Sequence, residues 1–143
     1  IIQEGRSMRC IELNPKGDFS NWEGDKLSEL ENQSLTELIG QTLVLENDWV
    51  KLWILIVQPK ERLVFRRFTN PYVWHGIKGG VAKRRLASGK IELLFIEAED
   101  SRYEEPEVGK SIRDFENMGD DTIELHIIEF KDQSILLAID QMV

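Results

Sequence analysis

Two histidines and a few carboxylates are the residues of this 143-residue chain that could do acid–base chemistry. His126 and Glu124 share a parity within an apolar run, so on a strand their side chains would project the same way, roughly 7 Å apart. Inside a pocket, the carboxylate would orient the imidazole and raise its pKa, as in a general base. Glu97 and Glu99 fall on the same strand face as Phe95. Two acids paired at the mouth of a barrel can do acid–base chemistry if crowding separates their pKa values. Both pairs also have a non-catalytic explanation. His126 and Glu124 would lie on an exposed strand face, and Glu97 and Glu99 would mark the point where a strand leaves the core.

Other chemistries lack their sequence signals. The single cysteine, Cys10, excludes an intrachain disulfide and a multi-cysteine zinc site, and we expect it to be a small buried hydrophobe. The chain has no Gly-x-Ser-x-Gly elbow, and the glycines of 76–80 match neither a P-loop nor a dinucleotide fingerprint. We therefore predict no catalytic residue, no cofactor and no metal site.

Basic residues are concentrated in 58–90, which hold nine Lys and Arg against one acid, although the whole chain has a net charge of −8. Arginines near aromatic side chains are typical of surfaces that bind phosphates and stack bases. The acidic remainder of the chain opposes nucleic acid, and an acidic loop over 97–107 is available to neutralise the arginines. We favour this self-complementation or a protein contact, and keep nucleic-acid binding as an alternative that would use Arg62, Arg66, Lys83, Arg84 and Arg85.

The chain has four tryptophans. Trp53 lies in an apolar run and is expected in the core, whereas the other three fall beside turns. Exposed tryptophans are enriched at interfaces, although residues that close the ends of a barrel would give the same pattern. The candidate ligand or partner surface comprises Trp22, Trp49, Tyr72, Trp74, His75, Arg62, Arg66, Arg84 and Arg85.

The elements that must position these residues are mainly strands. Short segments rich in Val, Ile, Leu and aromatics recur between turn residues at intervals of about 8–12 residues, which is typical of antiparallel sheet. The segment 52–57 is apolar on both parities, so we expect the strand over 49–57 to be interior and covered on both faces. The predicted strands are 8–13, 42–46, 49–57, 62–68, 81–86, 90–97, 122–130 and 135–139.

A helical period replaces the strand pattern between 25 and 40. Ser34 to Glu37 matches a capping box, and Gly40 is a natural C-cap. We predict one main helix at about 27–39, packed on the sheet through its leucine stripe, and a short second helix at about 111–118. The predicted fold class is α+β, with a strongly bent antiparallel sheet or partial barrel of seven to eight strands.

Length and composition favour one domain over 1–143, with 41% hydrophobic and 31% charged residues. Residues 1–7 precede Met8 and are interpreted as a cloning remnant or a disordered leader. A secretory signal is not evident and the one cysteine is unpaired, so we expect a cytoplasmic protein that does not associate with membranes.

Three functions follow as hypotheses. The leading one is a small, acidic, non-enzymatic binding protein, such as an inhibitor, an immunity-type protein or an accessory factor, whose partner is another protein or a second copy of itself. The first alternative is a small-ligand-binding barrel, extending to an enzyme that uses His126 with Glu97 or Glu124. Its pocket would be lined by Trp53, Phe95, Glu97, Glu124 and His126. The second alternative is nucleic-acid binding through the basic region 60–90.

Overall fold

The structure is a computed structural model that describes residues 9–14, 18–32, 36–106 and 111–131. The predicted strand over 135–139 and the leader over 1–7 lie outside these residues. The described part contains ten strands and one helix. In chain order they are β1 (Arg9–Glu12), α1 (Gly24–Asn32), β2 (Thr42–Glu46), β3 (Val50–Val57), β4 (Arg62–Arg67), β5 (Tyr72–Lys78), β6 (Gly80–Arg85), β7 (Ile91–Ile96), β8 (Ser101–Glu104), β9 (Ile112–Asn117) and β10 (Ile123–Phe130).

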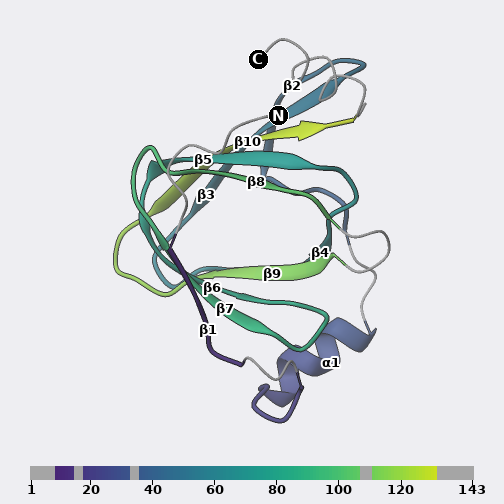
Figure 1. The fold of residues 1–143 in the computed structure, drawn as a ribbon, viewed down its shortest axis with the longest axis vertical. Coiled ribbons are helices and arrows are strands. Elements are labelled where there is room, and N and C mark those ends of the chain that lie inside the picture. Colours follow the sequence, from purple (N-terminus) through teal and green to yellow (C-terminus); the bar gives the residue numbers. More distant parts are fainter. Residues whose placement is uncertain (1–8, 15–17, 33–35, 107–110, 132–143) are drawn as a thin grey trace.

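Two five-stranded antiparallel sheets face each other (Figure 1). One has the order β1-β7-β6-β9-β4 and the other the order β2-β3-β10-β5-β8. Side chains from both sheets meet in one core, for example Trp53 and Ile127 from one sheet and Leu94 and Phe115 from the other. The molecule is therefore a β-sandwich, and the predicted α+β class is wrong.

Alternation of apolar and polar residues explains why these segments form strands. In β10, Ile123, Leu125 and Ile127 are at most 2% exposed, whereas Glu124 and His126 between them are half-buried. Side chains of a strand point alternately to opposite faces, so β10 presents one apolar row to the core. β6 and β7 pair as an antiparallel hairpin, which confirms the hairpin predicted for 81–97.

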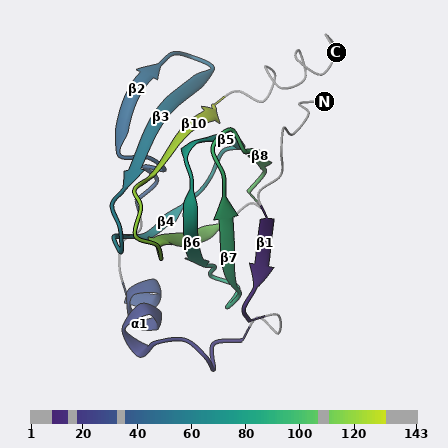
Figure 2. The ribbon, with the colours of Figure 1, turned by 90° about the vertical axis from the view of Figure 1, so that its left-hand side faces the viewer.

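The main helix is shorter than predicted and lies elsewhere. α1 spans Gly24–Asn32 and lies outside the sheet that contains β7, at the end of the molecule (Figure 2). Residues 33–35, with the predicted cap at Ser34, lie outside the described residues. Downstream, Thr36 bridges to Arg66 of β4, and Ile39 is buried between the sheets rather than on a helix. No helix in the described part of the chain is long and apolar enough to cross a bilayer.

The predicted helix at about 111–118 is wrong as well. These residues form β9, which pairs with β4 on one side and with β6 on the other. Two sheet neighbours supply backbone hydrogen bonds to this segment, and Asp114, Phe115 and Asn117 are buried there. Tertiary pairing thus overrides a local helix signal that rested on a single cap residue.

The strand over 49–57 is present as β3, between β2 and β10. Its inner face buries Trp53, Leu55 and Val57, which are at most 4% exposed. Its outer face is not covered, because Ile54 is half-buried and Ile56 is 39% exposed. The expectation of shielding on both faces is therefore wrong, and β10 rather than β3 occupies the centre of its sheet.

Candidate ligand-binding site

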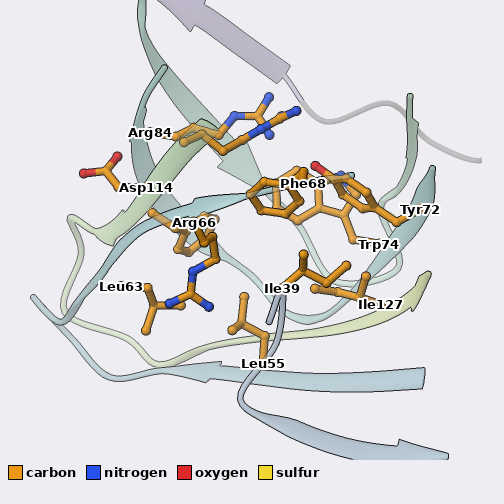
Figure 3. A pocket seen from close by; sticks show the side chains of 12 residues that line it. Ile39, Leu55, Leu63, Arg66, Phe68, Tyr72, Trp74, Arg84, Asp114 and Ile127 are labelled. Carbon is orange, nitrogen blue, oxygen red and sulfur yellow. The ribbon is translucent and has the colours of Figure 1, made fainter. Parts of the chain in front are cut away.

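A small cavity of about 30 Å³ lies between the two sheets (Figure 3). By volume it holds roughly two water molecules. Most of its wall is apolar or aromatic, and a few charged groups interrupt this wall. The lining side chains are those of Ile39, Leu55, Leu63, Arg66, Phe68, Tyr72, Trp74, Arg84, Arg113, Asp114, Phe115 and Ile127.

A bulge in β4 places Arg66 in this wall. Leu63 pairs with Phe115 of β9, but Arg66 pairs with Arg113, so β4 carries one extra residue between these two pairs. In a regular strand, Leu63 and Arg66 would point to opposite faces. The bulge shifts the alternation, and both side chains line the cavity.

Glu104 of β8 is the centre of a buried ion-pair cluster beside the cavity. Its carboxylate lies 2.9 Å from Arg84 Nη1, 2.6 Å from Arg113 Nη1 and 3.2 Å from Arg102 Nε. The Tyr72 hydroxyl donates a hydrogen bond to the same carboxylate. Burial raises the pKa of Glu104, but the charges of Arg84 and Arg113 outweigh burial and lower this pKa to about 2. Glu104 is therefore ionised at neutral pH.

Glu92 is the second carboxylate that holds Arg84. It accepts a hydrogen bond from Arg84 Nε at 2.8 Å. The Cys10 thiol also lies 3.5 Å from Glu92, and burial together with this carboxylate raises the pKa of Cys10. Cys10 is half-buried next to a charged group, so it is less enclosed than the predicted buried hydrophobe.

Asp114 forms a separate cluster on the same strand as Arg113. It accepts hydrogen bonds from Arg62 Nε at 2.8 Å and from Arg85 Nη1 at 2.7 Å. Arg62 also makes a two-pronged contact with Glu29 of α1, and Arg85 donates to Glu116 at 3.0 Å. Arg62, Arg84 and Arg85 are thus held by carboxylates of the same chain, but only Arg84 uses the acidic segment 97–107 that was expected to neutralise them.

Arg66 is the exception among the charged lining residues. Its Nη1 donates to the carbonyl oxygen of Leu38 at 3.0 Å, and its Nε to that of Val64 at 3.2 Å. Within the described part of the chain, Arg66 forms no ion pair with a carboxylate. Burial lowers the pKa of Arg66. In Figure 3 its guanidinium lies beside Leu63 and Leu55, away from Arg84 and Asp114.

Trp74 contributes a second unusual donor. The residue is 4% exposed, and its indole N–H has no hydrogen-bond partner among the described residues. Trp53, which is equally buried, donates its indole N–H to Glu129 at 2.9 Å. An unpaired buried donor is uncommon and calls for an explanation such as an unseen water or ligand.

His126 and Glu124, the acid–base pair of the barrel alternative, lie on the outer side of their sheet. His126 Nε2 and Glu124 Oε2 are 2.9 Å apart, closer than expected, but both side chains are on the outer face of β10. The inner face belongs to Ile127, which lines the cavity. His75 is the cross-strand neighbour of His126 and contacts Ser101 Oγ at 2.6 Å, also on the outer face.

The other residues of the predicted pocket do not converge either. Phe95 faces outwards, where the guanidinium of Arg9 lies 4.2 Å from its ring centroid. Glu97 is exposed after the end of β7. Leu94 and Ile96, of the opposite parity, enter the core. Trp53 is buried as predicted, but it does not line the cavity.

The predicted partner surface is dispersed. Trp22 is half-buried and stacks on Phe65 at 5.9 Å between ring centroids. Tyr72 and Trp74 are buried cavity residues. Trp49 alone of the three turn-proximal tryptophans is strongly exposed, at 53%.

Sequence reasoning did not single out several cavity residues. Glu104, which lies beside the cavity, fell in a segment predicted to be an exposed acidic loop, yet it is buried. Arg113 fell in the predicted second helix, and Ile39 at the end of the first. Four lining residues were included in the candidate surface: Arg66 and Arg84 for their charge, and Tyr72 and Trp74 as aromatic residues beside the basic segment.

A wider, more polar hollow of about 340 Å³ lies at the surface on another side of Arg113. Its lining includes Leu86, Ser88, Lys90, Glu105 and Ser111. The described residues include no group of three or more His, Cys, Asp or Glu side chains placed to hold a metal ion.

Comparison with solved structures identifies the architecture. No protein-family model and no curated protein matches the sequence. A cupin domain from Bordetella pertussis Tohama I superposes with a TM-score of 0.57 at 17% identity, covering 71% of this chain and all of that one. A protein with a double-stranded β-helix domain from Klebsiella pneumoniae gives 0.51 at 18% identity, covering 70% and 82%. At these identities the likeness establishes the fold alone, and that fold is a cupin-like β-sandwich.

Proposed function

We propose that this protein binds a small molecule in the cavity between its two sheets. The observation that carries the proposal is an apolar cavity into whose wall a charged side chain, Arg66, is placed by a bulge. Small-molecule sites are typically apolar hollows with a few convergent polar groups, and the interior of a β-barrel or sandwich is a common location. The first alternative drawn from the sequence is therefore the one we retain, with a different set of residues.

The proposal concerns binding and assigns no reaction. His126 and Glu124 lie on the outer face of β10, so they cannot act on a molecule inside this cavity. A non-enzymatic role, which the sequence analysis favoured, is compatible with ligand binding. The ligand is small, because the cavity holds roughly two waters.

The test uses two very small probes of similar shape at neutral pH, formate and formamide. We expect at least one of them to shift the methyl NMR resonances of Leu55, Leu63 and Ile127, which line the cavity, and to leave the outward-facing Ile128 unchanged. Filling the cavity by Ile127→Phe should abolish these shifts. The matched control is Ile128→Phe, one residue along the same strand, which should preserve them. If neither probe shifts the lining methyls of the wild-type protein, the proposal is wrong.

The other two hypotheses remain predictions. For a protein partner or a second copy, the described surface offers β2, whose five residues are all exposed, with Trp49 close by in sequence. For nucleic acid, Arg62, Arg84 and Arg85 are already held by carboxylates, which leaves Arg66 and Lys83 of the five residues proposed. Light scattering and a gel-shift titration at low salt test these two hypotheses directly.

A further inference from the structure

We propose that two copies of this chain pack face to face through an apolar row on the outer side of the sheet that contains β10. The row crosses all five strands of that sheet, and Ile128 is its middle residue. It lies outside the cavity, so this interface is independent of the proposed function. Four properties carry the proposal: the register of the strands, the exposure of the row, its lack of charge and the area of the surrounding face.

Strand register places five apolar side chains in one line. Ile128 of β10 pairs with Leu52 of β3 on one side and with Val73 of β5 on the other. Leu45 of β2 pairs with Leu52, and Tyr103 of β8 pairs with Val73, so the line reaches both edges of the sheet. Directly paired residues point to the same face, and this is the outer face, because alternate residues of these strands form the core. We refer to these five residues as the outer row.

The outer row is open to solvent although it is apolar. Ile128 is 39% exposed and Leu45 is 48% exposed, and the other three members are half-buried. α1 lies on the side of the other sheet, and none of the described helices and strands covers the row (Figure 2). An antiparallel sheet that faces water normally carries polar residues on that side, and an exposed apolar patch marks an interaction surface.

The matching row of the other sheet shows the usual pattern. It also crosses five strands, but three of its five residues are charged, and one of these, Arg62, is held by Glu29 of α1. Its residues, read across the strands, are Ile11, Leu93, Lys83, Glu116 and Arg62. The two outer surfaces therefore differ in kind, and only the sheet with β10 leaves a continuous apolar row open among the described residues.

The lack of charge in the outer row favours a second copy as its occupant. The chain has a net charge of −8, so a different protein that recognises it by charge would be basic and would bind where carboxylates are exposed. The outer row offers only an apolar surface to match. Two identical rows have the same length and match each other about a two-fold axis, which is the commonest symmetry of protein dimers. Such an axis places Ile128 opposite Ile128 of the partner subunit.

The polar residues beside the outer row are compatible with burial. His126 Nε2 lies 2.9 Å from Glu124 Oε2, and His75 Nδ1 lies 2.6 Å from Ser101 Oγ. A buried polar group is costly mainly when it has no partner. These contacts lie within one copy, so an apolar surface that packs on the row does not break them.

The face around the row is large enough for a dimer. Neighbouring strands lie about 4.8 Å apart and rise about 3.4 Å per residue, so the strands of this sheet, with eight, eight, seven, five and four residues, cover about 500 Å² in plan. Side chains make the accessible area larger than the plan area. The face therefore approaches the roughly 600–1,000 Å² per partner of standard-size interfaces, at the lower end of that range.

The first test is sedimentation velocity of the wild-type chain over a dilution series, at about 0.1 M and about 1 M salt. We expect a two-chain species that dissociates on dilution. Salt should lower its dissociation constant by about threefold or more, because the Debye length falls from about 10 Å to about 3 Å and the repulsion between two chains of charge −8 is screened. A one-chain mass at every concentration would overturn the proposal and leave the row to a different partner. A dimer that salt weakens would also overturn it, because charges would then hold the copies together.

Substitutions locate the interface. Ile128→Lys should raise the dissociation constant about tenfold or more, because it buries an unpaired ammonium group in the middle of the row, and Leu45→Lys tests the edge of the row in the same way. The matched control is Val64→Lys in β4 of the other sheet, an aliphatic residue that is 43% exposed, which should leave the dissociation constant unchanged. All three variants change the net charge equally, so overall repulsion cannot explain a difference between them. Equal dissociation constants in the three, each folded as judged by its thermal melt, would contradict the proposal.

A second measurement leaves the interface intact. In a Cys10→Ser background, Ile128→Cys places a thiol near the two-fold axis, and Val64→Cys places one on the other sheet. Facing sheets pack about 10 Å apart, so a short bismaleimide should join two copies of the Ile128→Cys protein at concentrations where the Val64→Cys protein stays unlinked. Equal yields of linked dimer from the two variants would overturn the face-to-face arrangement.

Discussion

Arg66 and Arg113 are direct cross-strand partners in β4 and β9, and both side chains line the same cavity. Like charges placed opposite each other in a sheet are destabilising. Arg113 is compensated by Glu104 at 2.6 Å, whereas Arg66 has no such carboxylate among the described residues. A local arrangement that lowers stability without an evident structural gain is typical of a functional site.

The buried cluster around Glu104 should be essential for stability. Glu104→Gln leaves three guanidinium groups without their shared carboxylate, so we expect the free energy of unfolding to fall by about 3–5 kcal/mol. The control Glu105→Gln changes the neighbouring, exposed residue and should alter it by less than about 0.5 kcal/mol. Urea denaturation of both variants checks this. Similar losses in the two would show that the cluster is not the cause.

The same residue predicts how stability depends on pH. The pKa of Glu104 is lowered from its usual 4.5 to about 2, so the unfolded chain binds this proton first as the pH falls. The stabilisation is complete above pH 4.5 and is lost between pH 4.5 and 2, to a total of about 3 kcal/mol. The free energy of unfolding, measured by urea denaturation at several pH values in this range, should depend less on pH in Glu104→Gln than in the wild-type protein. Identical pH dependence in both proteins would disprove the assignment to Glu104.

Two buried tryptophans should respond differently to loss of the indole N–H. Trp53→Phe deprives Glu129 of a 2.9 Å hydrogen bond, whereas Trp74→Phe removes a donor that has no partner among the described residues. Both variants lose similar apolar volume. We therefore expect Trp53→Phe to be the more destabilising by about 1–3 kcal/mol in urea denaturation. An equal or larger loss for Trp74→Phe would show that its N–H is already satisfied.

Gly40 should tolerate no side chain, because it lies directly against Trp53 and follows the cavity residue Ile39. A Cβ on Gly40 would lie 2.5 Å from Trp53 Cβ, so either the segment or the strand must move. We expect Gly40→Ala to lower the free energy of unfolding by about 1–3 kcal/mol. The control is Gly24→Ala in α1, where a Cβ meets nothing within 4 Å and alanine favours the helix. Thermal melts of both variants test this, and an unaffected Gly40→Ala would contradict it.

Strand positions were predictable where apolar and polar residues alternate clearly between turn residues, but not for β5 or β9. The alternation in Ile123, Leu125 and Ile127 and the Gly89 turn between β6 and β7 were sufficient to place those elements. The helix over 27–39 was predicted from the spacing of leucines and Ile39, yet Ile39 lies in the core as part of an extended segment. Apolar spacing records burial, but it does not show which neighbour provides the burial.

The sequence by itself determined a mostly antiparallel architecture, the burial of Trp53, and a basic segment able to pair with acids elsewhere in the chain. Only the tertiary structure decided which side chains line the cavity. A one-residue bulge in β4 turned Arg66 inwards, while the pairing of β10 left His126 outside. Bulges and strand partners depend on contacts between residues far apart in the chain, and local periodicity carries no information about them.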